Sequence, residues 1–399
     1  MNENLIQQQL AILNATFTPA AAITATDLFS GRGNQIDKVL GTVSEMGQHA
    51  VLYGERGVGK TSLANIITLL LQGNQNLTIC QKVSCDPTET FGDIWRKVFK
   101  KITITSQKSL PGFTERTRTE VQELSQFLNF TDDLKTSEVL SMLEQLPPSL
   151  LIFDEFESVK KAETRQKFSY TIKALSDSVP QVTLLLVGVA ENINSLIGDH
   201  RSIERCLKQI PLPRMSSNEI EGIIDKGLAR LNLGIEDSVK QDIVAFSQGL
   251  PQYTHLITKY AAKTAINVGS PIIIKSFFDV AVDEAIENVQ ESIRRCYEQA
   301  ILVNRPTHVS FKDIVLACVI AEEKSPEGFR AVDLQPALQQ LTGRKPRVQS
   351  YLYYLDELCK QNRGAILHKF GTSNRYRFKF SSSLARAFVR LKMYQTTKQ

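Results

Sequence analysis

The fold of this chain is decided by one stretch of eight residues, Gly54-Glu55-Arg56-Gly57-Val58-Gly59-Lys60-Thr61. Its spacing is that of a phosphate-binding loop: glycine, four residues, then Gly-Lys-Thr. The apolar run Val51-Leu52-Tyr53 before it predicts a strand, and the run from Ser62 to Leu71 after it predicts a helix. Glycines let successive backbone N–H groups turn toward phosphate oxygens, and the helix N-terminus adds a partial positive charge. The stretch therefore predicts a site for nucleotide phosphates.

The side chains of this loop have separate expected roles. Lys60 can reach the β- and γ-phosphates, and the hydroxyl of Thr61 can ligate Mg²⁺. We therefore expect ATP and Mg²⁺ as cofactors. The residues expected to bind the nucleotide here are Gly54, Glu55, Arg56, Gly57, Val58, Gly59, Lys60, Thr61 and Ser62.

Two acidic residues at the end of a second predicted strand lead us to expect that the nucleotide is hydrolysed. The apolar run Ser149–Phe153 predicts a buried parallel strand, and it ends in Asp154 and Glu155. An acid at the end of such a strand can hold Mg²⁺, so Asp154 is the expected metal residue together with Thr61. A neighbouring acid can polarise the attacking water, so Glu155 is the expected general base. The alternative is a solvated strand end, which is often acidic.

Length and composition limit the classes of protein to which this chain can belong. The chain has 399 residues, which is enough for two or three domains with real cores. No stretch approaches the roughly eighteen apolar residues of a membrane-spanning helix, and the polar, Gln-rich start Met1–Leu13 does not look like a signal peptide. The six cysteines form no Cys-x-x-Cys pair, so we interpret them as reduced thiols of a cytoplasmic protein.

Charge is unevenly distributed along the chain. Residues 305–399 carry 17 Lys and Arg against 7 Asp and Glu, a net charge of +10, while the rest of the chain carries −5. A basic C-terminal domain on a mildly acidic body suggests contact with double-stranded DNA. The alternative is a basic surface that aids solubility or docks an acidic protein.

Strands and helices alternate up to about residue 212. We expect further strands near Leu77–Val83 and Val182–Val187, and helices at Phe91–Ile104, Val121–Phe130, Thr136–Leu146 and 163–177, with a polar loop over Ser106–Thr119. Alternation of this kind predicts an α/β domain, a parallel sheet with helices on both faces. We place this nucleotide-binding domain at residues 25–212, after an N-terminal extension of residues 1–24.

Two further domains are expected. Residues 213–304 predict a helical lid, with helices at 217–231, 236–248, 252–267 and 273–300, and a capping box at Ser216 and Glu219. Residues 305–399 predict three helices, at 311–321, 331–341 and 347–361, and then a hairpin of two strands, 365–370 and 375–380. That is the order of a winged-helix domain.

The basic residues of this last domain are expected on one side of it. They lie at the start of the third helix and on the hairpin, and they are Arg344, Lys345, Arg347, Lys369, Arg375, Arg377 and Lys379. Strand alternation predicts that Tyr376, Phe378 and Phe380 pack on the core opposite the basic face.

Taken together, these residues resemble the AAA+ ATPases, nearest the origin-recognition and clamp-loader-like branch. Phe29-Ser30-Gly31-Arg32 resembles the segment that lines the adenine pocket in that branch, which makes Arg32 a cofactor-binding residue. Ile203-Glu204-Arg205-Cys206 resembles the Ser-Arg-Cys segment of clamp loaders, in which the arginine reaches the nucleotide of the neighbouring subunit. The resemblance thus implies a homo-oligomer with Arg205 as a catalytic residue. Arg201 is an alternative, and so is a surface arginine that pairs with a nearby acid.

The chain departs from that branch in the lid. Where the family carries a sensor arginine, this sequence has Gly249-Leu250-Pro251, which resembles the motif of the signalling ATPases called STAND, whose proline faces the nucleotide. Pro251 is therefore an expected cofactor-binding residue. The first sensor is expected at Glu191 or Asn192.

These features predict an ATP-hydrolysing molecular switch that oligomerises and binds DNA through the winged helix, in anti-phage defence or the regulation of mobile elements. The alternative is a STAND-like signalling ATPase that assembles with a separate effector protein and does not bind DNA directly. A third possibility is a nucleotide-binding scaffold with little turnover that is held by a partner protein.

Overall fold

The computed structural model describes residues 3–72, 79–109, 117–127, 134–189, 203–288, 291–302, 310–325, 327–372 and 375–398. It divides into two compact units. One is residues 22–213, and the other joins residues 1–21 to residues 214–399.

A five-stranded sheet forms the centre of the unit at 22–213, in the order β2-β5-β6-β1-β7. Every pair in it is parallel. The bounds are β1 His49–Gly54, β2 Ile79–Ser84, β5 Ser149–Asp154, β6 Val182–Val189 and β7 Leu207–Pro211. The strand that leads into the phosphate loop, β1, lies between β6 and β7, and the acid strand β5 is the next one beyond β6. The expected P-loop α/β fold, a parallel sheet in which the phosphate loop follows β1, is confirmed. The sequence did not predict β7.

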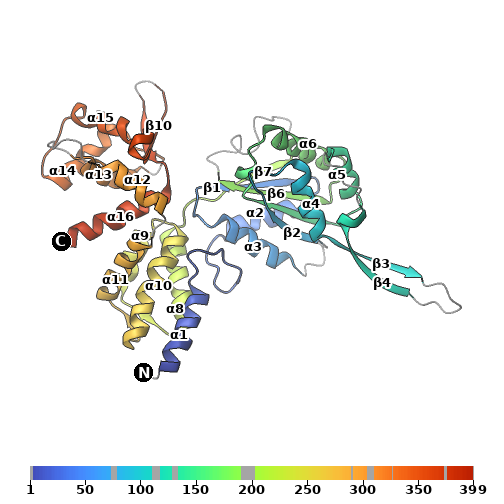
Figure 1. Ribbon diagram of the computed structural model, residues 1–399, viewed down its shortest axis with the longest axis horizontal. Helices are drawn as coiled ribbons and strands as arrows, with labels where there is room; N and C mark the ends of the chain where they lie inside the picture. The colour runs from blue at the N-terminus through green and yellow to red at the C-terminus, as the bar shows by residue number, and fades with distance from the viewer. Residues whose placement is uncertain are drawn as a thin grey trace. The chain divides into compact units, whose positions relative to one another are not determined.

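Helices cover both faces of this sheet (Figure 1). They are α2 Gly33–Ser44, α3 Lys60–Leu71, α4 Phe91–Lys101, α5 Thr136–Leu143 and α6 Ala162–Ser178. The core beneath α4 and α6 is aromatic, because Trp95 packs against Phe153 at 5.3 Å and Phe168 at 5.9 Å between ring centroids. All six residues of β5 are buried, as its apolar run predicts.

The segment between α4 and α5 differs from the prediction. Strands β3 Thr103–Ser109 and β4 Thr117–Glu123 pair as an antiparallel hairpin, followed by a 3₁₀ turn η1 at Leu124–Phe127. It extends away from the rest of its unit in Figure 1. The predicted loop is wrong at 106–109 and 117–119, and the predicted helix is wrong at 121–127, whereas residues 110–116 and 128–130 lie outside the described ranges. Alternating β-branched residues such as Thr117, Thr119 and Val121 favour a strand over the weak helical spacing.

The second unit is mainly helical. It contains α1 Glu3–Thr16, α8 Ser217–Leu231, α9 Asp237–Ser247, α10 Pro251–Val268, α11 Lys275–Glu287 and α12 Glu291–Ile301, with a short parallel pair, β8 Gly234–Ile235 and β9 Ile272–Ile273. The capping box at the start of α8 is confirmed, since the Ser216 hydroxyl accepts from the N–H of Glu219.

A single long helix over 273–300 was predicted, and this is wrong. Helix α11 ends at Glu287, where the amide of Asn288 donates to the Glu284 carbonyl at 2.8 Å. Arg294 of α12 donates to the Glu287 carbonyl at 2.6 Å. These side chains satisfy the carbonyls at a helix end, which the apolar spacing alone does not reveal.

The N-terminal residues form a helix rather than only an extension. Helix α1 packs on α8 and α10. Phe17, just after α1, lies so close to Gly227 of α8 that a β-carbon at that glycine would come within 2.2 Å of the ring. The backbone N–H of Thr18 donates to Nδ1 of His255 on α10 at 3.3 Å. The start of the chain thus belongs to the helical unit.

The C-terminal residues follow the predicted order of three helices and a hairpin. They form α13 Phe311–Lys324, α14 Leu334–Thr342, α15 Gln349–Leu358, β10 Leu367–Phe370 and β11 Arg377–Phe380, and then a helix that was not predicted, α16 Ser383–Lys398. A buried ion pair joins Glu322 of α13 to Arg386 of α16 at 3.1 Å.

Phe378 and Phe380 are buried, as expected, but Tyr376 is 43% exposed, so its predicted place in the core is wrong. The ladder of the hairpin begins at Arg377, opposite Phe370, so strand alternation does not govern Tyr376. Its ring instead lies 4.2 Å from the ammonium group of Lys369.

The six cysteines all lie in the described ranges, and each carries a free thiol. Within those ranges, none of the helices has both the length and the apolar character that crossing a bilayer requires.

Candidate functional site

The phosphate loop joins the end of β1 to the start of α3. Gly57 and Gly59 have φ angles of 86° and 95°, in the left-handed region that favours glycine. A β-carbon at Gly54 would come within 2.3 Å of the Leu212 carbonyl oxygen, so the backbone approach there also requires glycine. The motif glycines are therefore needed to build the loop.

Lys60 is buried within the loop that it follows. Its Nζ donates to the carbonyl of Glu55 at 2.7 Å and to that of Gly54 at 3.0 Å. Burial lowers the pKa of Lys60 to about 8, and the carboxylates of Glu157, Asp154 and Glu55 partly oppose this. The ammonium group is thus next to the backbone that is expected to surround phosphate.

Thr61 and Asp154 come together from distant parts of the sequence. The Thr61 hydroxyl makes a long hydrogen bond, 3.4 Å, to Oδ1 of Asp154, and the N–H of Glu155 donates to the same oxygen at 3.0 Å. A hydroxyl and a carboxylate oxygen side by side fit Mg²⁺, which prefers oxygen ligands. The two predicted metal residues therefore have the donor chemistry and the proximity that such an ion needs.

Glu155, the expected base, has a left-handed backbone with φ 57° and an exposed side chain. It precedes a 3₁₀ turn, η2 Phe156–Ser158. Within that turn, Glu157 has a buried carboxylate oxygen that has no hydrogen-bond partner among the described residues. Of the charges that raise the pKa of Lys60, that of Glu157 has the largest effect. Sequence reasoning missed Glu157, and the only available signal was a third acid so soon after β5.

Lys82 was also missed. It lies in the middle of β2, and its Nζ is 3.3 Å from Oδ2 of Asp154. A lysine inside an otherwise half-buried strand was the available signal. Its partner became apparent only from the pairing of β2 with β5, which sets Lys82 opposite Ile152.

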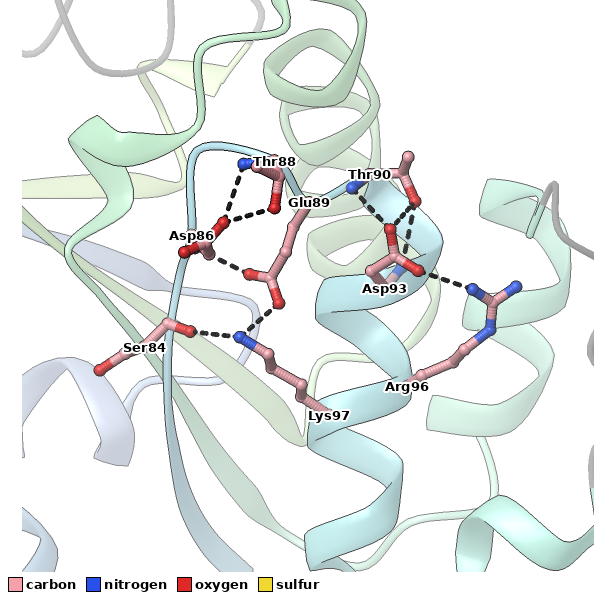
Figure 2. Close-up of polar contacts among 8 residues, drawn as sticks. All are labelled: Ser84, Asp86, Thr88, Glu89, Thr90, Asp93, Arg96 and Lys97. Atoms are coloured by element: carbon pink, nitrogen blue, oxygen red, sulfur yellow. Dashed lines mark hydrogen bonds and ion pairs between the residues drawn. The ribbon is translucent and has the colours of Figure 1, made fainter.

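The loop after β2 supports this edge of the sheet (Figure 2). The N–H of Cys85 donates to the Asp154 carbonyl at 2.8 Å. Lys97 of α4 pairs with Glu89 and donates to the Ser84 carbonyl at 3.0 Å. Asp86 accepts from the backbone of Thr88 at 2.9 Å, and Thr90 and Asp93 form a capping box at the start of α4. The backbone beside Asp154 is therefore held by a network of its own.

Arg32 and Ser62 make contacts other than those expected of nucleotide ligands. Nη2 of the buried Arg32 donates to the carbonyl of Val58 in the loop at 3.2 Å and to that of Pro213 at 2.7 Å. The hydroxyl of Ser62 accepts from the N–H of Ile23 at 3.1 Å. Arg32 thus supports the loop backbone, and Ser62 fixes the segment that leads into this unit.

The remaining predicted residues are more scattered. Arg205 pairs with Asp177 at 2.7 Å, and both side chains are exposed. Arg201 and the proposed sensors Glu191 and Asn192 lie outside the described residues. Pro251 is the first residue of α10, in the other compact unit.

A family model described as novel STAND NTPase 1 matches residues 19–331, which is well over half of the chain. This chain belongs to that STAND NTPase family. The resemblance inferred from the sequence, to AAA+ ATPases with STAND-like features, is confirmed. This STAND NTPase carries the phosphate loop, the acid strand and the Gly249–Pro251 segment all within the matched range.

Solved structures that are similar to this STAND NTPase over most of their length have low sequence identity to it. Cdc6p of Pyrobaculum aerophilum is 14% identical, over 96% of this chain and 98% of that one, with a TM-score of 0.48. The Orc1 protein of Aeropyrum pernix, solved in complex with DNA, is 12% identical over 98% of both chains, with a TM-score of 0.48. The RuvB Holliday junction branch migration motor of Thermotoga maritima is 17% identical over 94% and 97%, with a TM-score of 0.46. A comparison with curated proteins gives no match.

Proposed function

We propose that this STAND NTPase is a switch that binds ATP with Mg²⁺ and hydrolyses it. The observation that supports this most directly is the meeting of Thr61 and Asp154 beside the buried Lys60. A phosphate-binding backbone, a cation and two oxygen donors for a metal ion thus come together at one edge of the sheet.

Each residue has a defined task in this proposal. Lys60 exchanges the carbonyls of Glu55 and Gly54 for phosphate oxygens. Thr61 and Asp154 hold Mg²⁺, which when bound supplies positive charge beside the β- and γ-phosphates. Glu155 orients the attacking water and takes its proton. Its exposed side chain leaves it free to face a water molecule.

Calorimetry with ATP and with GTP, each with Mg²⁺ and with EDTA, tests this proposal. The wild type should bind ATP more tightly than GTP, and more tightly with Mg²⁺ than without it. Lys60→Ala should abolish tight binding, because the phosphate charge loses its buried cation. Lys173→Met, at an exposed position of α6, is the control and should bind as the wild type does. Equal binding by Lys60→Ala and wild type would rule the site out.

The switch is proposed to act as a homo-oligomer, with Arg205 or Arg201 completing the site of a neighbouring copy. The pairing of Arg205 with Asp177 involves two exposed side chains, so it contributes little stability and can be exchanged. Free thiols at all six cysteines support a reducing compartment, and we propose the cytoplasm.

Double-stranded DNA is a second proposed ligand, bound by residues 305–399 as a winged helix. The supporting observation is an exposed basic set whose side chains make no hydrogen bond or ion pair with another described residue: Arg344, Lys345, Arg347 and Arg375. The other basic residues of this domain are more engaged. Lys369 pairs with Asp356 at 2.7 Å, and Arg377 donates to the Gly328 carbonyl at 2.8 Å.

A separate effector protein remains the alternative partner, and in that case the basic domain makes no direct contact with DNA. The biological setting that we propose, anti-phage defence or the regulation of mobile elements, is tested by phage challenge of cells carrying the wild type or Lys60→Ala. Equal protection by the two would separate any defence role from nucleotide binding.

A further inference from the structure

Asp154 divides its two carboxylate oxygens between different partners. Oδ1 accepts from the Thr61 hydroxyl at 3.4 Å and from the N–H of Glu155 at 3.0 Å. Oδ2 is 3.3 Å from the ammonium group of Lys82. The side chain of Asp154 is 3% exposed and that of Lys82 is 23% exposed, so water screens this ion pair only in part.

The position of Lys82 is fixed by its backbone. Strand β2 pairs with β5, which carries Asp154 at its end, and the carbonyl of Lys82 accepts from Nζ of Lys101 at 2.6 Å. Because the backbone of Lys82 is held in this way, only its side chain can move away from Asp154. A lysine is seldom placed in a strand interior unless it is paired, because burial of its charge is costly. An uncharged residue of the same length would fill that position without this cost.

A divalent cation beside Thr61 would bring two further positive charges close to Lys82. Charges of like sign a few ångströms apart repel, and the repulsion is larger where water is partly excluded. Lys82 also neutralises the same carboxylate that is proposed to ligate the metal. Both effects weaken the hold of Asp154 on a cation.

We propose that Lys82 is a positioning residue that holds the Asp154 carboxylate and sets how strongly Mg²⁺ promotes nucleotide binding. This inference rests on the proposed ATP site. Lys82 stabilises Asp154 when no metal is bound, and the metal must compete with it. The Mg²⁺ requirement of the switch is thereby tuned by a residue of β2, outside both sequence motifs.

The test measures the ratio of two dissociation constants for ATP, one in EDTA and one in excess Mg²⁺, by calorimetry on the full chain. The ratio reports how much the metal contributes to binding. Lys82→Met should raise this ratio by roughly tenfold over the wild type, the size of effect that an opposite charge at this distance commonly has on a carboxylate. Lys82→Arg keeps the charge and should leave the ratio near the wild-type value.

Lys101→Met is the matched control, because it removes a neighbouring lysine that touches the backbone of Lys82 and not Asp154. It should also leave the ratio unchanged. A ratio for Lys82→Met equal to or below that of the wild type would overturn the inference. If Lys82→Met fails to fold, as judged by circular dichroism, Lys82→Gln gives the same comparison.

The outcomes separate this inference from the function on which it rests. If the wild type binds no ATP under either condition, the proposed ATP site itself is wrong. If the wild type binds ATP and Lys60→Ala does not, while Lys82→Met leaves the ratio unmoved, only the role of Lys82 is wrong.

Discussion

Arg32 and Pro213 are joined by a 2.7 Å hydrogen bond from the guanidinium Nη2 to the carbonyl oxygen. The same nitrogen donates to the carbonyl of Val58 in the phosphate loop at 3.2 Å. One buried side chain therefore links the phosphate loop to the last residue of its compact unit. The next residue, Arg214, begins the other unit and lies 3.9 Å from the buried carboxylate of Glu322 there. The peptide bond between Pro213 and Arg214 thus connects two anchored residues.

Replacement of this link is the first prediction. Arg32→Met keeps most of the apolar stem but removes the donor to the carbonyl of the buried Val58, at a cost of about 1–3 kcal/mol if that carbonyl stays buried. The carbonyl of the exposed Pro213 can accept from water instead. We expect a lower free energy of unfolding and weaker ATP binding, measured by urea denaturation and calorimetry. Lys173→Met is the control for a lost surface charge. Wild-type stability and affinity in Arg32→Met would show that the bridge has no structural importance.

Stability should fall in mild acid because of two buried histidines, one in each unit. Burial lowers the pKa of His49 to about 4 and that of His255 to about 4, against 6.5 for an unhindered imidazole. The unfolded chain takes up protons near pH 6.5, while the folded chain resists until near pH 4. The contribution of the two neutral histidines to the free energy of unfolding is therefore fully present well above pH 6.5 and is lost as the pH falls from 6.5 toward 4. Each histidine should lower the free energy of unfolding by about 2 kcal/mol between pH 7.5 and pH 5.

His49→Asn tests this pH dependence. His49 accepts a hydrogen bond from the N–H of Leu184 at 3.0 Å through Nδ1, and an asparagine oxygen can accept the same bond without titrating. The stability of the unit at 22–213 should then change less between pH 7.5 and pH 5 than in the wild type. An unchanged pH dependence would mean that His49 already carries a proton in the folded protein at pH 5.

Assembly is tested by mixing two inactive variants. Arg205→Ala keeps its own phosphate loop, and Lys60→Ala keeps its arginine. If Arg205 acts on a neighbouring copy, the mixture should recover part of the wild-type ATP turnover that neither variant has alone. Full activity of Arg205→Ala by itself would show that Arg205 only forms a surface ion pair with Asp177. Arg201 would then be the residue to test.

DNA binding should depend on salt in proportion to the phosphates contacted. Neutralising Arg344, Lys345, Arg347 and Arg375 in the full chain should flatten the slope of log affinity against log salt by up to about 3.6, since each phosphate contact contributes roughly 0.9. Lys160 and Lys161, exposed in the other unit, are the control positions. Fluorescence anisotropy with a short duplex measures the slope. Absence of salt-sensitive binding by the wild type would favour an effector protein as the partner.

The sequence predicted those parts of the fold and the site that depend on residues close together in the chain. The phosphate loop and the acid strand are short motifs whose chemistry fixes their own geometry, so Lys60, Thr61 and Asp154 were placed correctly beside one another. Lys82 and Glu157 reach the site only through the pairing of β2 with β5 and through the turn after β5. The sequence offers only weak signals for these two residues, a lysine inside a strand and a third acid soon after β5.

The two-residue pair β8–β9 also depends on residues that are distant in sequence. The hairpin β3–β4 is local, and its alternating β-branched residues are the signal that the weak helical spacing obscured. The role of Arg32 also depends on Pro213, far away in sequence, whose carbonyl it holds. Helix α8, by contrast, was predicted to the residue, because a capping box marks its start and amphipathic spacing runs along its whole length.

The measurement that tests the central claim most directly is single-turnover ATP hydrolysis by wild type and Glu155→Gln, with calorimetry on the same samples. We predict that Glu155→Gln binds ATP with Mg²⁺ as the wild type does but hydrolyses it about 10²-fold more slowly, the size expected for the loss of a positioned base. Equal hydrolysis rates in the two proteins, at equal ATP affinity, would contradict the account.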